Sequence, residues 1–340
     1  MAQINKPNTY FNPVLYTGTG STQSITGVNF QPDFVWLKER NSSAYSHNLF
    51  DVVRGVLKTI QANNTGAEQN ATTALSSFNA DGFTVGTDIG VNENGTNFVG
   101  WNWKAGGTAS SNTGGSITSS VSASTTSGFS IVSYTGTNAV ATVGHGLGVA
   151  PSMIIFKNRN TTDNWNVFHA SRGNGKFIRL NESDAEGNTS RFNNTSPTSS
   201  VFSLGASSPV NGSGNNIIAY CFAEKKGFSK FGSYVGNGAN DGTFVYTGFK
   251  PAFVMVKRTN STGNWHMADN KRLGYNPDQN DLFADLDNSE DTGNYTDIVS
   301  NGFKFRNSEA THNGSGDSFI YMAFAENPLV GTNGIPATAR

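Results

Sequence analysis

The chain contains the stretch Pro32-Asp-Phe-Val-Trp-Leu-Lys38 and returns to its pattern twice, as Pro151-Ser-Met-Ile-Ile-Phe-Lys157 and Pro251-Ala-Phe-Val-Met-Val-Lys257. Each stretch places a lysine six residues after a proline, with mostly apolar residues between them. A short apolar run of this kind is typical of a buried strand, and proline is accepted at the first residue of a strand. We therefore predict one buried central strand in each of three related units.

The similarity between the three units continues on both sides of these stretches. Each unit opens with a tyrosine two residues before a glycine, at Tyr16, Tyr134 and Tyr234. Each closes with an apolar strand, at 97–103, 216–222 and 318–324. A later strand is indicated between the central and the closing strand, at 81–85, 201–204 and 301–305. At about 100 residues, each unit is long enough for a core of its own.

These patterns predict an all-β fold of three tandem, diverged β-sandwich domains of the jelly-roll type. The expected segments are a first repeat with an N-terminal arm, a Gly/Ser/Thr linker, a second repeat, a third repeat and a tail, at 1–105, 106–126, 127–226, 227–328 and 329–340. Two local alternatives stay open. Residues 116–124 alternate weakly and could add an edge strand to the second repeat, while 49–61 has apolar residues at a helix-like spacing that Gly55 disfavours.

The composition supports this fold class and narrows the function. The 340 residues include 39 glycines and 42 asparagines, which fit polar turns between short strands. Only 14% of the residues are charged and the net charge is −1, so we expect no nucleic-acid partner and no attraction to a membrane surface. No apolar run is long enough to insert in a bilayer, and no signal-peptide pattern is present, so we expect synthesis in a cytoplasm.

Catalysis, metals and cofactors have little support in the sequence. Five histidines are present, but the common hydrolase and nucleotide-binding motifs are not, and three copies of one weak pattern do not suggest a single active site. We expect neither an enzyme nor a cofactor. The acidic stretch 278–291 could offer oxygen ligands to Ca²⁺, although it lacks the glycine and closing glutamate of an EF-hand loop, and a solvated loop is the simpler interpretation.

One polar pattern recurs in all three repeats and supplies the candidate site residues. An aspartate or histidine is followed three residues later by an arginine, in the pairs Asp51/Arg54, His169/Arg172 and Asp269/Arg272. The structural interpretation is a side-chain pair that ties a loop to the sheet edge. The functional interpretation is a polar groove in which Trp165 or Trp265 stacks on a sugar. An exposed tryptophan would favour the groove, and a buried one would favour core packing, which we take as the default.

Longer stretches carry a resemblance to a known group of proteins. They are Tyr10-Phe11-Asn-x-x-Leu15-Tyr16-Thr-Gly18, Ile25-Thr-Gly-Val-Asn-Phe30-Gln-Pro32-Asp-Phe-Val-Trp36-Leu-Lys38 and Gly144-His-Gly-Leu-Gly-Val-Ala-Pro151-Ser-Met-Ile-Ile-Phe-Lys157. The chain resembles, over about 10–328, a repeat domain of marine bacteriophage virion proteins that are usually described as tail-fibre-like or structural. The resemblance implies a component of a phage particle, located in the virion beside other virion proteins. It carries over no catalytic or receptor-binding residue.

Three hypotheses follow for the function. The first is a tail fibre or other peripheral fibre that contacts a host-surface polysaccharide, and the second is a capsid decoration or head fibre protein with an architectural role. The third, a polysaccharide depolymerase, would need a carboxylate pair in a groove, which three similar copies do not suggest. Because weak sugar binding gains from several copies, we expect a homo-oligomer, with a trimer favoured. No coiled-coil heptads are present to enforce one.

Overall fold

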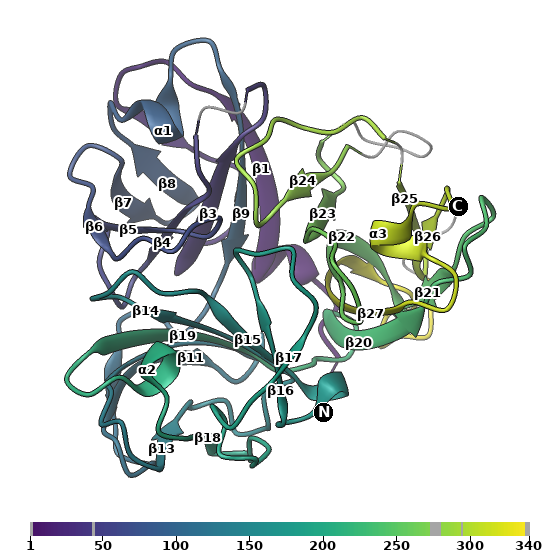
Figure 1. Ribbon diagram of the computed structural model, residues 1–340. Coiled ribbons are helices and arrows are strands. Elements are labelled where there is room, and N and C mark those ends of the chain that lie inside the picture. Colours follow the sequence, from purple (N-terminus) through teal and green to yellow (C-terminus); the bar gives the residue numbers. More distant parts are fainter. Residues whose placement is uncertain (1–2, 43–44, 273–279, 294, 337–340) are drawn as a thin grey trace.

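The computed structural model describes residues 3–42, 45–272, 280–293 and 295–336 and consists largely of antiparallel strands (Figure 1). Strands make up 43% of the chain and helices 6%, which confirms the all-β prediction. The central, later and closing strands predicted in each repeat are all present. No helix within the described residues is long and apolar enough to cross a membrane.

Three large sheets share one strand order, in which the first strand lies beside the last and the central strand follows on the other side. The first sheet is β1 (Phe11–Thr17), β9 (Asn97–Trp103), β3 (Phe34–Glu39), β4 (Asn48–Asp51), β5 (Lys58–Gln61) and β6 (Gln69–Asn70). The second is β10 (Ser110–Asn112), β11 (Ser119–Ser124), β12 (Phe129–Thr135), β19 (Asn216–Phe222), β14 (Met153–Asn158), β15 (Asn166–His169), β16 (Lys176–Arg179) and β17 (Gly187–Asn188). The third is β20 (Ser229–Val235), β27 (Ser318–Pro328), β22 (Phe249–Arg258), β23 (His266–Asp269) and β24 (Leu282–Phe283).

Three small sheets cover the outer faces of the large ones and give each repeat two layers. They are β2 (Gln23–Ile25), β8 (Gly82–Val85) and β7 (Leu75–Asn79); β13 (Ala141–Gly144) and β18 (Val201–Leu204); and β21 (Phe244–Tyr246), β26 (Gly302–Phe305) and β25 (Thr296–Val299). The helices are single turns, namely η1 (Pro7–Thr9), α1 (Ile89–Asn92), η2 (Ala170–Arg172), α2 (Ser208–Asn211) and α3 (Ala310–Asn313).

The structure decides both local alternatives. Residues 119–124 form β11, which pairs with β12, so the added strand is confirmed, but its edge position is wrong because β10 pairs with its other side. Part of the expected linker therefore lies in the second sheet. The helix alternative at 49–61 is wrong, because this segment forms β4, a turn and β5. Gly55 has a φ of 88° in that turn, a conformation that interrupts a helix and favours glycine.

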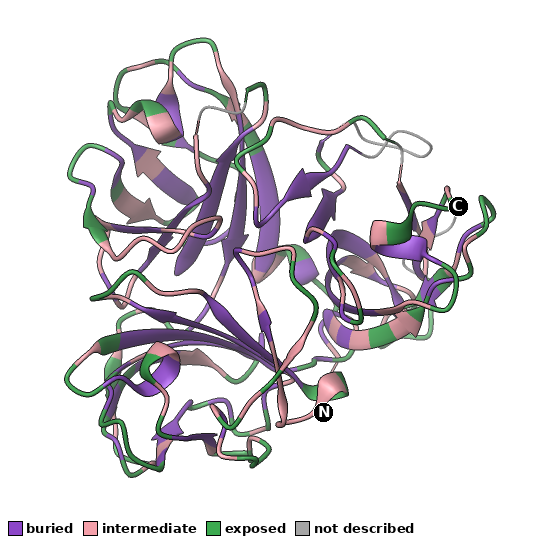
Figure 2. Cartoon of the chain, viewed as in Figure 1, coloured by how far each residue is buried: buried purple, intermediate pink, exposed green. Residues whose placement is uncertain are grey.

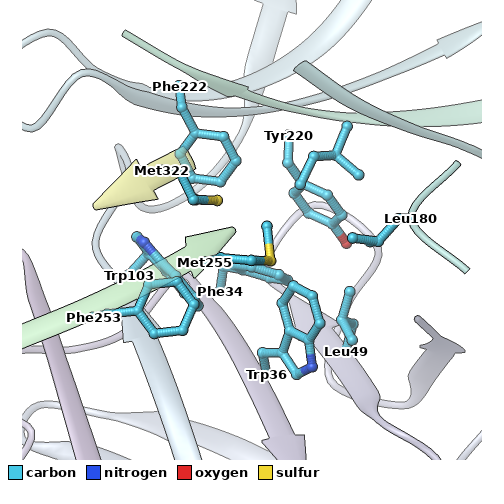
Figure 3. Close-up of a pocket in the computed structure, with 11 residues that line it drawn as sticks. Phe34, Trp36, Leu49, Trp103, Leu180, Tyr220, Phe222, Phe253, Met255 and Met322 are labelled. Carbon is cyan, nitrogen blue, oxygen red and sulfur yellow. The ribbon is translucent and has the colours of Figure 1, made fainter. Parts of the chain in front are cut away.

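One hydrophobic core joins the three repeats. It contains inward-facing residues of all three large sheets, while three smaller cores lie between each large sheet and its small partner. Figure 2 shows the large-sheet strands as mostly buried, with exposure concentrated in the loops. Figure 3 shows the centre, where Trp103, Phe222 and Met322 come from different repeats around an apolar void of about 10 Å³. The division into three tandem domains therefore stays a prediction, because the described repeats share a central core in addition to the smaller core of each.

Buried asparagines hold the loops of each repeat and account for part of the asparagine excess. Asn92, Asn211 and Asn313 end the three α-turns and are fully buried. The Nδ2 of Asn211 donates to the carbonyls of Ala139 and Gly205 at 2.7 and 3.0 Å, and its Oδ1 accepts from the Thr137 amide at 2.8 Å. One side chain thus supplies partners to three backbone groups that would otherwise lack them.

Replacing this amide with an apolar side chain of similar size is expected to destabilise the protein strongly. Asn211→Leu leaves two carbonyls and one amide without partners, so we expect the free energy of unfolding to fall by about 3 kcal/mol or more. Urea denaturation measures the change. Asn288→Leu, at an exposed position, is the control and should stay within about 0.5 kcal/mol of the parent. Equal losses in the two variants would contradict this assignment.

Candidate functional site

The two candidate tryptophans lie inside the shared core. Trp165 and Trp265 are 0% and 1% exposed, so neither presents a ring face to an external ligand. Each indole crosses to the preceding repeat: Nε1 of Trp165 donates to the Gln61 carbonyl at 2.9 Å, and Nε1 of Trp265 donates to the Arg179 carbonyl at 2.8 Å. These locations favour the core-packing interpretation of both residues.

His47 occupies, in the first repeat, the position that Trp165 and Trp265 occupy in the other two. Its surroundings complete a cycle of contacts in which each repeat meets both of the others. Burial lowers the pKa of His47 well below its ordinary value, and the carbonyl of Phe283 in the third repeat is among the groups that oppose this fall. Phe283 pairs with β23 as Gln61 pairs with β4, so the His47 ring lies beside the equivalent strand, although its Nε2 forms no hydrogen bond there like those of the two indoles. The second repeat therefore contacts the first, the third contacts the second, and the first contacts the third.

The two Asp/Arg pairs are buried and have the same arrangement. The Asp51/Arg54 and Asp269/Arg272 side chains are 0% exposed. In the second of these pairs, Nε of Arg272 donates to Asp269 at 2.6 Å, and its Nη2 donates to the Met267 carbonyl at 2.8 Å. Burial alone would raise the pKa of Asp269, but Arg272 and the neighbouring donors hold it below its ordinary value. This carboxylate is therefore ionised and fully engaged at neutral pH.

Each of these acidic or histidine residues also contacts the closing strand of the next repeat. The Tyr220 hydroxyl donates to Asp51 at 2.8 Å, and the Trp101 indole donates to Asp269 at 3.0 Å. His169 instead lies 3.3 Å from the Tyr321 carbonyl, an acceptor. Burial lowers the pKa of His169 to about 4, so its ring is neutral at pH 7 and can donate through Nε2.

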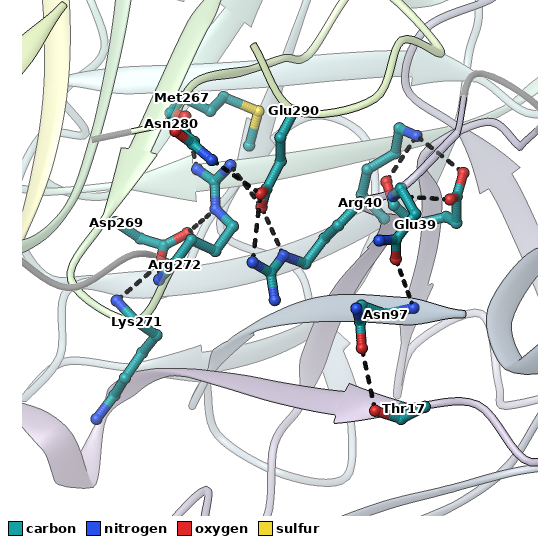
Figure 4. A network of polar contacts seen from close by, with 12 residues as sticks. Thr17, Glu39, Arg40, Asn97, Met267, Asp269, Lys271, Arg272, Asn280 and Glu290 are labelled. Carbon is teal, nitrogen blue, oxygen red and sulfur yellow. Dashed lines mark hydrogen bonds and ion pairs between the residues drawn. The ribbon is translucent and has the colours of Figure 1, made fainter. Parts of the chain in front are cut away.

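Sequence reasoning missed one glutamate in each repeat that contacts these arginines, and in the first and third repeats this glutamate also binds an arginine of a neighbouring repeat. Figure 4 shows Glu290 between Arg272 of its own repeat and Arg40 of the first, with the Arg40 contacts at 2.5 and 3.2 Å. Glu68 likewise binds Arg159 at 2.8 and 2.9 Å. The Glu186 carboxylate binds Arg172 of its own repeat at 2.6 and 2.7 Å. The third repeat has Thr259 at the position of Arg40 and Arg159, so it offers no arginine to Glu186 there, and Thr259 instead accepts from the Glu186 backbone amide through its carbonyl. The available signal was a glutamate 14 residues after the arginine in the first two repeats.

The lysine of each central strand is buried, and two of the three lysines form hydrogen bonds between repeats, whereas Lys38 donates to the Glu39 carbonyl of its own repeat. Lys38, Lys157 and Lys257 are 0% exposed. The ammonium of Lys157 donates to the Thr65 carbonyl of the first repeat at 3.0 Å, and that of Lys257 donates to two carbonyls of the second repeat, at 3.1 and 2.8 Å. Burial lowers the pKa of all three lysines to about 8.

The acidic stretch proposed for Ca²⁺ is engaged by protein donors where it is described, and Asp278 lies outside the described residues. Asp285 accepts from the Trp265 amide at 2.9 Å, Asp291 accepts from the Tyr295 hydroxyl at 2.9 Å, and Asp281 contacts His266 at 2.8 Å. His266 also lies 3.1 Å from the Thr311 hydroxyl. Within the described chain, no group of three or more His, Cys, Asp or Glu residues is placed to hold a metal ion.

The candidate residues are therefore brought together as contacts between repeats. None of the eight lines any of three surface grooves, of about 230, 280 and 540 Å³. Their polar atoms meet backbone and side-chain partners from two repeats, so the arrangement can fix the repeats in one orientation but offers no cleft to a ligand. This location favours the structural interpretation of Asp51/Arg54 and Asp269/Arg272. His169 and Arg172 do not form a pair, because His169 contacts the Tyr321 carbonyl and Arg172 binds Glu186.

Two equivalent arginines allow a matched test of this interpretation. Arg272→Met leaves Asp269 as a buried carboxylate without its cation, so we expect a loss of about 3–5 kcal/mol in the free energy of unfolding. Arg172→Met removes a half-buried arginine, with 27% of its side chain exposed, and should cost about 1 kcal/mol or less. Chemical denaturation of both variants measures the difference. Similar losses in the two variants would show that the contribution of the Asp269/Arg272 pair to the free energy of unfolding does not depend on its burial.

The buried lysines predict an unusual pH dependence. An unfolded lysine keeps its proton up to about pH 10.5, whereas the three folded ones lose theirs near pH 8. Between these values the unfolded chain binds more protons, so the free energy of unfolding should rise from pH 8 to about pH 10. Buried Cys221, whose pKa is raised, opposes part of this rise. Lys157→Met should reduce the lysine contribution by about a third. Urea titrations across this range measure the slope, and a flat or falling profile would contradict the prediction.

Comparison with known proteins comes to one positive finding. No curated protein and no solved structure matches the chain significantly. Residues 6–328 match a family described as a domain of unknown function, DUF7483. Because this match spans nearly the whole sequence and all three repeats, the chain belongs to the DUF7483 family.

Proposed function

We propose that this chain is a non-enzymatic structural protein of a bacteriophage particle, as part of a tail fibre or another peripheral fibre that contacts host-surface polysaccharide. The observation that carries the proposal is the joining of three repeats through one core and a cycle of buried polar contacts. A particle protein must keep its shape under mechanical load, and cross-links of this kind resist separation of the repeats. The sequence resemblance supports the same conclusion.

The proposal includes three tandem β-sandwich units that act as one body, and assembly of several chains, with a trimer favoured. Each repeat has a large and a small sheet with a core between them, which supports the sandwich description. Several copies on one particle would raise the avidity of weak sugar contacts. The other virion proteins would be its partners. The alternative is a capsid decoration or head fibre protein, for which the same rigidity would serve an architectural role.

Binding and location together test this function. Purified protein, multimerised on beads, is expected to bind printed lipopolysaccharides or capsular polysaccharides of host bacteria, and immunogold labelling of particles is expected to mark the tail or a peripheral fibre. Labelling of the head without polysaccharide binding would favour the decoration alternative, and no labelling of particles would overturn the virion proposal. Release of reducing sugar or ester hydrolysis that disappears in His266→Ala would contradict the non-enzymatic part, since His266 joins a carboxylate to a hydroxyl.

A further inference from the structure

A polar groove of about 230 Å³ opens where the first and third repeats meet. One wall comes from η1, β1 and the loop at 26–33, and the other from the end of β23 and from β27. Its lining includes five asparagines from these separate segments, Asn8, Asn12, Asn29, Asn270 and Asn327. Amide groups from distant parts of the chain therefore converge on one surface feature.

Four of these amides differ from most asparagines in the protein. The side chains of Asn8, Asn29, Asn270 and Asn327 make no hydrogen bond within the described chain. The Oδ1 of Asn270 is shielded from solvent and still lacks a donor. Buried polar atoms are normally paired, so an unpaired acceptor in a groove indicates that a ligand or water supplies the donor. The four amides offer both donors and acceptors to such a ligand.

The walls that carry these amides are held firmly. Asn12 is 8% exposed, and its Nδ2 donates to the carbonyls of Gly27 and Val28 at 3.1 and 3.2 Å. The Asp81 carboxylate accepts from the backbone N–H groups of Gly27 and Asn29, at 3.0 and 2.6 Å. The groove is therefore formed before a ligand arrives, which lowers the entropy cost of binding.

The charge of the groove is close to neutral. Glu326 lines it, but its carboxylate is 2.7 Å from the Lys250 ammonium. Lys271 is exposed at the rim and adds one positive charge. Small apolar contacts come from Ala252 and Ala325 at the base. This combination does not favour a phosphate or a polyanion, which would need several cations.

We infer that this groove binds a neutral, hydroxyl-rich saccharide unit through the side-chain amides of Asn8, Asn29, Asn270 and Asn327. Each sugar hydroxyl both donates and accepts hydrogen bonds, and a carboxamide is complementary to adjacent hydroxyls on a ring. The inference rests on the proposed function and gives its polysaccharide contact a location and a ligand class. It places that contact away from the tryptophans and arginines singled out in the sequence.

The test uses the full chain on an array that carries bacterial surface polysaccharides, neutral mannan and dextran, and acidic polygalacturonate. We expect binding to neutral glycans, and a loss of affinity of about 10-fold for Asn270→Leu and for Asn8→Ala, equivalent to about one hydrogen bond each. Asn288→Leu, an exposed asparagine outside the groove, is the control and should bind as the parent does. Thermal melts of all variants verify folding, and Asn8 is exposed, so its truncation should leave the fold intact.

The outcomes separate this inference from the proposed function. If the parent binds neutral glycans and both groove variants bind equally well, the groove assignment is wrong while polysaccharide contact stands. Binding only to polygalacturonate, lost in Lys271→Met, would overturn the neutral ligand class. If the parent binds nothing on the array, both the groove inference and the polysaccharide contact are overturned. That result would favour the alternative function, a capsid decoration or head fibre protein.

Discussion

Burial of the inner face of each large sheet is the constraint on which the remaining structure depends. A sheet that is apolar on both faces needs a partner on each side. The small sheets cover the outer faces, but the inner faces, with residues such as Trp36, Trp103 and Phe253, have only one another. A single repeat would therefore expose a large aromatic surface to water. This explains why three units of about 100 residues form one core instead of three beads on a chain.

Apolar burial brings the repeats together but does not by itself define their orientation, because it is not directional. The relative orientation of the repeats is defined by the directional polar contacts that Asp51, His169 and Asp269 make with the next repeat. Asp51 and Asp269 accept from a tyrosine and a tryptophan of the neighbouring closing strand. At the third contact a neutral histidine replaces the carboxylate, and a backbone carbonyl replaces the donor. Donor and acceptor have exchanged places while the pairing persists, so the contact itself, rather than either residue type, is what the arrangement requires.

Much of the fold could be predicted from the sequence, because strands and repeats depend on local patterns. The proline-to-lysine stretches, the closing strands and the spacing of Asp or His to Arg were all visible. Two things were not. Nothing local distinguishes a core inside one repeat from a core shared by three, and a lysine such as Lys157 looks solvated until its carbonyl partners from another repeat are known. Glu68 and Glu290 were missed for the same reason, since their arginine partners in another repeat are distant in sequence.

The asparagine excess divides into two populations, and this division bears most directly on function. Asn92, Asn211 and Asn313 are buried and bound, and their number follows from having three repeats that each need the same loop support. Asparagines that only support loops would be expected to recur in this way. The groove asparagines do not: they come from η1, a loop, and the ends of β23 and β27, and four of them have no partner in the described chain. Because the described chain supplies no hydrogen-bond partner to these four amides, they are available to the hydroxyl-rich ligand that we infer for the groove.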